Sequence, residues 1–217
     1  MSSDGVGEVW TIVVAGGTGR RFGGLKQYEL LSGRSVLERS VDRAREASAG
    51  VVVVLPPHDA GAPGTVAGGS TRSESVRNGL AAVPESATIV LVHDAARPFA
   101  SAGLYARVIA AVRAGAAGAI PGVAVTDTIK VVETVDGVRT VVDTPDRSTL
   151  VAVQTPQGFE AAALRSAHAA GGEGTDDASL VEAAGGRIVV VEGEVMNRKI
   201  THTEDLEWAR QYAKVVG

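Results

Sequence analysis

The chain has 217 residues, of which 45% are hydrophobic and 21% are charged, and it contains no cysteine. This length suits one domain of ordinary size, and the missing cysteine excludes a disulfide framework, a thiolate nucleophile, an iron–sulfur cluster and a zinc site with thiolate ligands. The formal net charge of −4 argues against a nucleic-acid partner. Because residues 1–7 lack a signal-peptide pattern and no apolar run approaches the ~20 residues of a membrane span, we expect a cytoplasmic protein with no membrane partner.

Short runs of β-branched residues alternate with alanine-rich segments along the chain. The runs are continuously apolar, as expected for strands buried on both faces, and lie at Val9–Val14, Val51–Leu55, Ile89–Val92 and Ile188–Val191. The helices predicted between and after them begin at Ser35, cover Ser75–Val83, Leu104–Ala114 and Thr175–Ala184, and end with one capped by Thr203. This alternation predicts an α/β fold, a Rossmann-like, mostly parallel sheet flanked by helices, in a single domain over residues 1–217.

One segment departs from this pattern. Two β-rich runs, 128–135 and 138–143, flank Asp136-Gly137, and Asp-Gly between such runs is a strong signal for a type I′ hairpin. A two-residue turn would pair Val135 with Val138, Val132 with Val141, Val131 with Val142 and Lys130 with Asp143. Apolar pairs would then cover both faces, so we expect residues 127–146 to form a protruding arm that packs against a second subunit in a homodimer. The alternative is a hairpin folded back on its own domain.

Glycines follow the first predicted strand directly. In Ala15-Gly16-Gly17-Thr18-Gly19-Arg20-Arg21-Phe22 they allow backbone N–H groups to approach a polyanion, and Arg21 and Lys26 supply positive charge. The loop lacks the Gly-Lys-Ser/Thr of a Walker A motif, and Phe22 stands where the Rossmann dinucleotide motif has its last glycine. The sequence therefore predicts a phosphate-binding loop and disfavours NAD; the alternative is an ordinary strand–helix turn.

Ordered blocks along the chain resemble those of the 2-C-methyl-D-erythritol 4-phosphate cytidylyltransferases. The glycine loop followed by Lys26-Gln27-Tyr28 is similar to their nucleotide-binding loop, although many sugar-nucleotide transferases share such a loop. The more specific block is Val92-His93-Asp94-Ala95-Ala96-Arg97-Pro98. Further matching blocks lie, in the family's order, at residues 68–76, 127–130, 146–147, 154–157, 175–179 and 197–201.

The resemblance implies a reaction. Members of this family transfer the cytidylyl group of CTP to 2-C-methyl-D-erythritol 4-phosphate and release pyrophosphate, with Mg²⁺ or another divalent cation, in non-mevalonate isoprenoid synthesis. A phosphate oxygen attacks the α-phosphorus of CTP in line, and fixed cations can stabilise that step without a covalent nucleophile. A chain without cysteine is consistent with such chemistry.

The resemblance also implies roles for individual residues. The implied catalytic residues are Arg21, Lys26, Arg147 and Lys199. The implied nucleotide-binding residues are Ala15, Gly16, Gly17, Gly19, Gly69, Ser70, Ser75, Asp94 and Ala95, with Asp94 also as a metal ligand. The implied substrate-binding residues are Arg97, Thr128, Arg147, Thr155, Thr175 and Lys199, of which Thr128 and Arg147 would come from the partner subunit's arm. Outside these roles, Ser75 is open to interpretation as a helix N-cap, and His93 is expected to be structural because the attacking phosphate is already anionic.

Departures from the family pattern leave alternatives open. Met196 stands where several members carry an aspartate that contributes to contacts with the alcohol hydroxyls, so a cytidylyltransferase for another polyol phosphate, such as ribitol 5-phosphate, is an alternative. Ser70 replaces an aspartate that some members carry at the base pocket, where backbone contacts would survive. A transferase for UTP, GTP or ATP is disfavoured by the block at 68–76. A non-catalytic nucleotide-binding homologue is disfavoured because Arg21, Lys26, Arg147 and Lys199 are all present.

Overall fold

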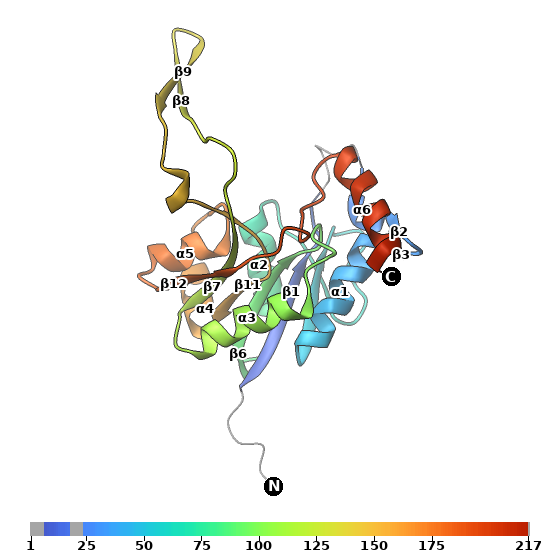
Figure 1. The fold of residues 1–217 in the computed structure, drawn as a ribbon. Helices are drawn as coiled ribbons and strands as arrows, with labels where there is room; N and C mark the ends of the chain where they lie inside the picture. The colour runs from blue at the N-terminus through green and yellow to red at the C-terminus, as the bar shows by residue number, and fades with distance from the viewer. Residues whose placement is uncertain (1–6, 18–23, 217) are drawn as a thin grey trace.

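The computed structural model describes residues 7–17 and 24–216. Its centre is an eight-stranded sheet in which β1 pairs in parallel with β4 and β6, β4 with β5, and β7 with β12, whereas β10 and β11 run antiparallel to their neighbours (Figure 1). The strands are β1 (Glu8–Val14), β4 (Gly50–Leu55), β5 (Thr65–Ala67), β6 (Ala87–Asp94), β7 (Gly118–Ala124), β10 (Val151–Val153), β11 (Gln157–Glu160) and β12 (Ile188–Glu192). The prediction of a mostly parallel α/β sheet is confirmed.

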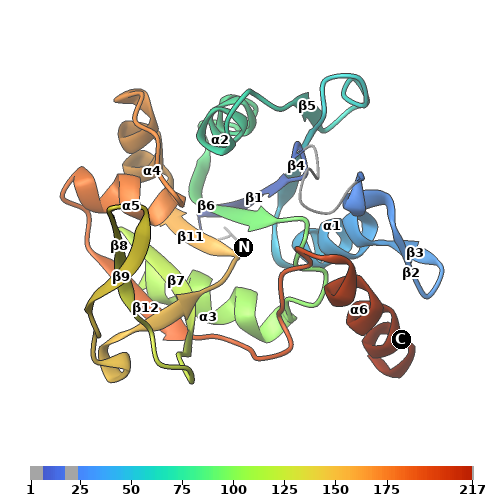
Figure 2. The ribbon, with the colours of Figure 1, turned by 90° about the horizontal axis from the view of Figure 1, so that it is seen from above.

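Helices cover both faces of this sheet (Figure 2). In β1, Val13 packs with the residues of α1 (Val36–Ala47) and α3 (Ala102–Arg113), whereas its neighbour Ile12 packs on the opposite face. That opposite face is covered by α2 (Arg72–Ala81), α4 (Ala161–Ala169) and α5 (Asp177–Ala183). Because both faces are buried, β1, β4 and β6 appear in the sequence as continuous apolar runs, which is why they could be located there; the fourth run found from sequence is β12, whose side chains are only half-buried or exposed.

A smaller unit beside the sheet combines the last helix with a segment from the first part of the chain. The last helix, α6 (Thr203–Val216), packs its buried Leu206 and Ala209 against Leu31 of the short strand β2 (Leu30–Leu31), which pairs with β3 (Arg34–Ser35). The single-turn helix η1 (Lys26–Tyr28) precedes β2. No helix in the described ranges is long and apolar enough to cross a bilayer.

The side chains predicted to cap the helices are confirmed at α1 but not at α2 and α6. The Ser35 hydroxyl accepts from the Glu38 N–H, and the Glu38 carboxylate accepts from the Ser35 N–H, which completes the capping box of α1. The alternative of Ser75 as an N-cap and the prediction of Thr203 as an N-cap were both wrong. Thr71 rather than Ser75 caps α2, because the Thr71 hydroxyl accepts from the backbone N–H of the third helical residue. Thr203 is itself the first residue of α6, and the Asp205 carboxylate accepts from the N–H groups of Thr201 and His202 before it.

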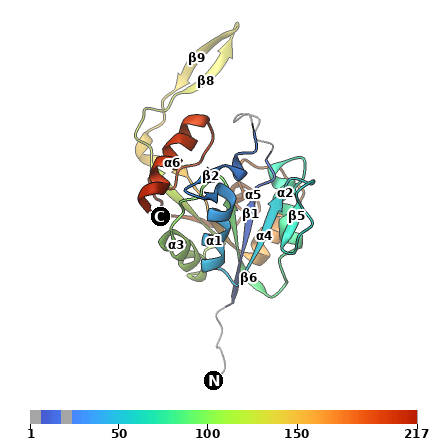
Figure 3. The same ribbon diagram turned by 90° about the vertical axis from the view of Figure 1, so that its right-hand side faces the viewer.

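Residues 131–143 form a hairpin that stands away from the sheet (Figures 1 and 3). It consists of β8 (Val131–Val135) and β9 (Val138–Asp143), joined by Asp136 at φ 50° and Gly137 at φ 79°, the positive values that a type I′ turn requires. Two predicted pairs, Val135 with Val138 and Val132 with Val141, are present. The pairing beyond them was wrong.

A register shift changes the base of the hairpin. Val131 pairs with Asp143 rather than with Val142, so Val142 is the extra residue of a β-bulge. Lys130 donates instead to the Thr144 hydroxyl, at 2.8 Å. The bulge increases the local twist of the hairpin. No turn or composition signal marks it in the sequence.

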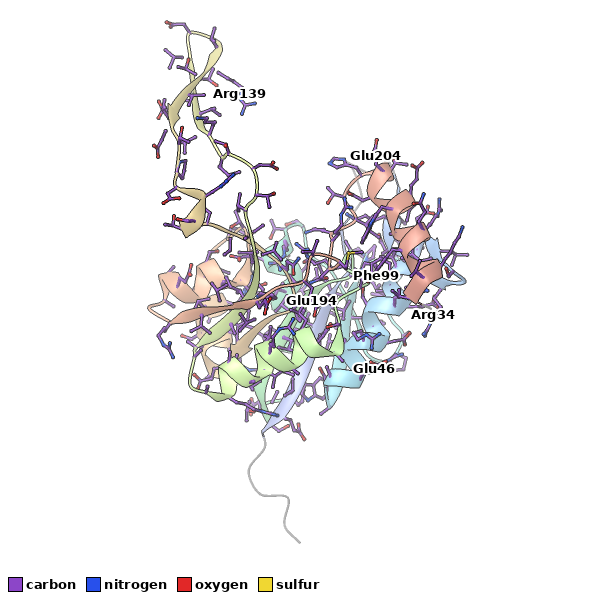
Figure 4. All side chains as sticks on the ribbon, viewed as in Figure 1. Arg34, Glu46, Phe99, Arg139, Glu194 and Glu204 are labelled. Carbon is purple, nitrogen blue, oxygen red and sulfur yellow. The ribbon has the colours of Figure 1, made fainter. Side chains whose placement is uncertain are left out.

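The hairpin does not fold back on its own domain. Every residue of β9 is exposed, and Val131, Val135, Val138, Val141 and Val142 are each more than 40% exposed. In Figure 4 the side chains of this segment, Arg139 among them, stand clear of the rest of the molecule. Residues 127–146 are called the arm below. The chain leaves the sheet after β7, passes through the arm, and returns to the sheet through the short helix η2 (Arg147–Thr149) and β10.

Candidate active site

The carboxyl ends of two central strands meet at one cleft. Val14, the last residue of β1, lies in register with Asp94, the last residue of β6, and loops leave the sheet from both. This edge is where ligands bind in open α/β sheets. The cleft has a volume of about 480 Å³ and is lined by Val14, Ala15, Gly16, Gly17, Lys26, Gln27, Gly69, Ser70, Thr71, Arg72, Ser75, Asp94, Ala95, Ala96 and Lys199.

Glycines bring two loops together at one wall of the cleft. A Cβ built on Gly16 would meet the Gly68 Cα at 3.5 Å, so the loop after β1 packs directly on the loop before α2. The Ser75 hydroxyl accepts from the Gly69 N–H at 3.0 Å and donates to the Thr71 carbonyl at 2.8 Å. The loop before α2 is therefore tied to the first turn of the helix, with its backbone at the surface of the cleft.

The Glu74 side chain orders the outer part of the same loop. Its carboxylate accepts from both the backbone N–H and the hydroxyl of Ser70, each at 2.6 Å. These two bonds lower the pKa of Glu74. The donors of Ser70 are thus already paired with a carboxylate in this structure, which limits what its side chain can offer a ligand.

Asp94 carries the negative charge at the floor of the cleft. Lys199 Nζ lies 2.6 Å from Asp94 Oδ2, and a guanidinium nitrogen of Arg72 lies 3.7 Å from Asp94 Oδ1. Burial alone would raise the pKa of Asp94, but the charges of Lys199 and Arg72 outweigh it and hold this pKa well below its usual range. A second lysine, Lys26, donates to the Ile200 carbonyl at 2.7 Å, so two ammonium groups face one cleft.

Buried hydrogen bonds through Thr155 and His93 hold the backbone of Asp94 in place. The Thr155 hydroxyl accepts from the Asp94 N–H at 3.0 Å and lies 3.1 Å from His93 Nδ1, while His93 Nε2 lies 3.1 Å from the Arg97 carbonyl. A carbonyl only accepts, so Nε2 carries the proton and Thr155 donates to Nδ1. Burial lowers the pKa of His93 to about 4, which keeps the ring neutral. The Thr155 hydroxyl is thus buried, and it makes its hydrogen bonds inside the protein rather than in the cleft.

Arg97 ties the C-terminal loop to the sheet. Its guanidinium donates to the Asn197 carbonyl at 2.8 Å and to the Val153 carbonyl at 3.3 Å. The Asn197 side chain in turn donates to the Thr155 carbonyl at 2.9 Å. These bonds anchor the loop that presents Lys199.

The structure brings together many, but not all, of the implied site residues. Those that line the cleft are Ala15, Gly16, Gly17, Lys26, Gly69, Ser70, Ser75, Asp94, Ala95 and Lys199. Gly19 and Arg21 lie outside the described residues. Thr128, Arg147 and Thr175 are exposed and are not among the cleft residues, and Arg147 donates to the Thr126 carbonyl at the base of the arm, at 2.7 Å.

Comparison with known proteins decides the family. Residues 9–214 match the family model described as IspD: 2-C-methyl-D-erythritol 4-phosphate cytidylyltransferase. The chain belongs to the IspD family. It is 46% identical over 221 residues to the "2-C-methyl-D-erythritol 4-phosphate cytidylyltransferase" of Rhodococcus jostii (strain RHA1), with 96% of each chain covered.

Solved structures of IspD proteins share this fold. The crystal structure of 2-C-methyl-D-erythritol 4-phosphate cytidylyltransferase from Thermus thermophilus matches with a TM-score of 0.81 and 39% identity, over 95% of this chain and 99% of that one. Among curated relatives, the "Bifunctional enzyme IspD/IspF" of Nitratidesulfovibrio vulgaris (strain DP4) is 45% identical over 91% of this chain but only 56% of its own length. The chain thus spans about half the length of such bifunctional relatives.

The surroundings of Asp94 do not fit a metal ion held by the protein alone. Its carboxylate lies between two cations, Lys199 and Arg72, which disfavour a further positive ion at the same oxygens. Over residues 7–17 and 24–216, no three His, Asp or Glu side chains come together as metal ligands. These residues do not fit an ion held by the protein alone, so the geometry does not support Asp94 as a resident metal ligand.

Sequence reasoning missed a charged residue of the cleft, Arg72. It lies inside the recognised block at 68–76, yet no role was assigned to it. The helix predicted from sequence begins at Ser75, so Arg72 could not be recognised there as a first helical residue, a position where the helix dipole disfavours a cation. Its partner Asp177 lies far away in the sequence, and only the folded chain shows the pair.

Proposed function

We propose that this chain transfers the cytidylyl group of CTP to 2-C-methyl-D-erythritol 4-phosphate, releasing pyrophosphate and forming 4-diphosphocytidyl-2-C-methyl-D-erythritol. The observation that carries the proposal is one cleft, in an IspD family member, that joins a glycine-lined backbone surface to Lys26, Lys199 and Asp94. Glycine-lined backbone accepts a nucleotide at close range, and the two ammonium groups suit its phosphates.

The chemistry requires positioning and charge rather than a nucleophilic side chain. An oxygen of the polyol phosphate forms a bond to the α-phosphorus of CTP while the bond from that phosphorus to the bridging α–β oxygen breaks. Negative charge develops on the α-phosphate oxygens and on the leaving pyrophosphate. Lys26, together with Arg21, would hold the triphosphate and stabilise that charge, while Lys199 would position the attacking phosphate.

The nucleotide-binding residues divide between two loops. Ala15, Gly16 and Gly17, with Gly19, would offer backbone N–H groups to the phosphates. Gly69 and Ser70 would face the cytosine mainly through their backbone carbonyls, because their N–H groups donate to Ser75 and Glu74. Asp94 and Ala95 would lie beside the ribose, and Asp94 Oδ1, which Lys199 does not bond, would face it.

A divalent cation such as Mg²⁺ would enter as the counter-ion of CTP. The described residues do not fit a resident ion, since the only carboxylate among those that line the cleft is flanked by Lys199 and Arg72. Bound to the triphosphate, the ion would offset part of its negative charge. No step of the proposed reaction depends on a protein ligand to it.

The arm would complete the site of a second subunit in a homodimer. Its valines are exposed on a two-stranded hairpin, which is marginal in water by itself. Thr128 and Arg147, which would bind the polyol phosphate, lie at the base of the arm and not in the cleft of their own chain. An arm that reaches the partner's cleft would bury these valines and bring Thr128 and Arg147 to the partner's substrate. Arg97, Thr155 and Thr175 would support this substrate subsite, Thr155 through Asp94 rather than by direct contact.

Pyrophosphate release tests the proposal. The purified chain is assayed with CTP and Mg²⁺ against 2-C-methyl-D-erythritol 4-phosphate, ribitol 5-phosphate and erythritol 4-phosphate, and with UTP in place of CTP. We expect release with CTP and methylerythritol phosphate to exceed every other combination. Greater release with ribitol 5-phosphate would favour the alternative that Met196 leaves open, and no release with any polyol would indicate a nucleotide-binding homologue without this activity.

A further inference from the structure

A chain of ion pairs runs from the cleft into the core. Lys199 contacts Asp94, Asp94 lies 3.7 Å from Arg72, and an Arg72 nitrogen lies 2.9 Å from Asp177 Oδ2. His168 Nε2 lies 3.0 Å from the other oxygen, Asp177 Oδ1, and donates to it because a carboxylate only accepts. The series links the C-terminal loop, β6, α2, α5 and α4.

Arg72 stands where helix energetics do not favour it. It is the first residue of α2, and a positive charge in the first turn is disfavoured by the helix dipole. Its side chain is only 27% exposed, so its charge is also largely removed from water. A residue that breaks a local rule and lines the cleft points to a functional constraint on its position.

Asp177 lies in the first turn of α5, where the helix dipole favours a negative charge, but it is not the N-cap of that helix. The N-cap of α5 is its neighbour Asp176, whose carboxylate accepts from the Ser179 N–H at 3.0 Å. Asp177 itself is fully buried and gives one oxygen to Arg72 and the other to His168. A buried carboxylate needs such partners, and α4 and α5 lie on the same face of the sheet as α2, which lets them supply one (Figure 2).

We propose that Arg72 is a positioning residue for nucleotide binding, and that Asp177, held by His168, sets the position of Arg72. Arg72 and Lys199 approach different oxygens of Asp94, so together they fix the plane of its carboxylate. Oδ1, which Arg72 approaches without a hydrogen bond, is then presented to the cleft. This inference rests on the proposed function, because the ligand presented to Oδ1 is CTP.

The two nitrogens used by Arg72 belong to one planar group. A guanidinium can face Asp94 and Asp177 at the same time, whereas an ammonium is a single point of charge. The proposed role therefore depends on the shape of the side chain as well as on its charge. It also explains why Asp177 matters to a cleft that it does not line.

The test measures the Kd for CTP by titration calorimetry, with the melting temperature recorded for every variant. Arg72→Met should raise the Kd at least about tenfold, while the KM for the polyol phosphate changes less than about twofold. Arg77→Met is the matched control, because Arg77 lies on the same helix and pairs with the exposed Glu173 outside the cleft. It should bind CTP as the wild type does.

A double-mutant cycle tests the order of the series. Asp177→Asn should weaken CTP binding when Arg72 is present and have little further effect, less than about twofold, in the Arg72→Met background. If the two substitutions raised the Kd for CTP additively, the proposal that Asp177 acts through Arg72 would be overturned. If Asp177→Asn does not fold, Arg72→Lys decides: we expect a Kd at least about threefold above wild type, and wild-type affinity would overturn the need for a planar group.

The result also separates this inference from the proposed function. If the wild-type chain does not bind CTP, the proposed function fails. If it binds CTP and Arg72→Met binds equally well in a folded state, only the role of Arg72 is overturned.

Discussion

Lys199 Nζ lies 2.6 Å from Asp94 Oδ2, which joins the C-terminal loop to the carboxyl end of the central strand β6. The Lys199 side chain is 40% exposed, so its ammonium group also reaches the open part of the cleft. One lysine can therefore hold the carboxylate and still face an anionic substrate.

Replacement of this lysine should affect turnover more than folding. We expect Lys199→Met to lower kcat by at least about 10², because an ammonium that positions the attacking phosphate is lost. Steady-state kinetics with CTP and methylerythritol phosphate give the measurement. Arg198→Met is the control: Arg198 lies over the Trp208 ring, 4.5 Å from its centre, and does not line the cleft. Equal losses in both variants would contradict the role of Lys199.

Lys26 should act on the triphosphate. Lys26→Ala is expected to reduce kcat by about 10² or more, because a cation facing the charge that develops on the phosphates is removed. Lys214→Ala, a change in the last turn of α6, should leave kcat within about twofold of wild type. Near-wild-type turnover of Lys26→Ala would contradict the assignment of the cleft.

Ser75 should support CTP affinity through the backbone. Ser75→Ala removes the acceptor of the Gly69 N–H, which loosens the loop that would face the base. A lost buried hydrogen bond costs about 1 kcal/mol, so we expect the KM for CTP to rise about three- to tenfold with kcat nearly unchanged. Ser86→Ala, in an exposed segment, serves as the control. An unchanged KM in Ser75→Ala would contradict a role of this hydrogen bond in CTP binding.

The stability of the fold should depend on pH through His93. Its pKa is about 4 in the folded chain, where burial disfavours the charge, against about 6.5 in the unfolded chain. Between these values the unfolded chain binds more protons, so the free energy of unfolding rises with pH, by roughly 2–4 kcal/mol across the window. Below about pH 4 this contribution is absent, and above about pH 7 it is complete.

Urea unfolding between pH 4 and pH 7 measures this slope. The ring of His93 faces the Thr155 hydroxyl, the Arg97 carbonyl and the Tyr105 ring, with Asp94 and Arg97 as the nearest charges. His93→Gln should lose the His93 part of the slope, whereas His58→Gln, at an exposed position, should keep it. An identical slope in wild type and His93→Gln would place the pH dependence elsewhere.

The sequence predicted the parts of the fold that depend on local signals. β1, β4 and β6 are largely buried on both faces, so their apolar runs are unbroken, and Asp136-Gly137 has the turn chemistry that a type I′ hairpin requires. β5 and the seven-residue β7 were not predicted, the latter because Gly118, Pro121 and Gly122 interrupt its apolar pattern. Nor were β10 and β11. They are three and four residues long, and their partners β6 and β7 are distant in the sequence.

Contacts between distant residues account for most of what sequence reasoning missed in the site. The blocks that resemble the family placed Lys26, Asp94 and Lys199 in one cleft, as the structure shows. Thr155 was expected to bind substrate directly, yet its hydroxyl pairs with His93 and with the Asp94 N–H. α4 was missed because no side chain caps its first turn, which removed the usual start signal.

The most direct test combines two inactive subunits. A heterodimer with Arg147→Ala in one subunit and Lys199→Ala in the other is co-expressed with two different affinity tags and purified through both. If the arm of one subunit serves the cleft of the other, one of the two sites keeps both groups, and the heterodimer should show about half of wild-type activity, while each homodimer stays nearly inactive. A heterodimer no more active than the two homodimers would contradict an active site shared between subunits.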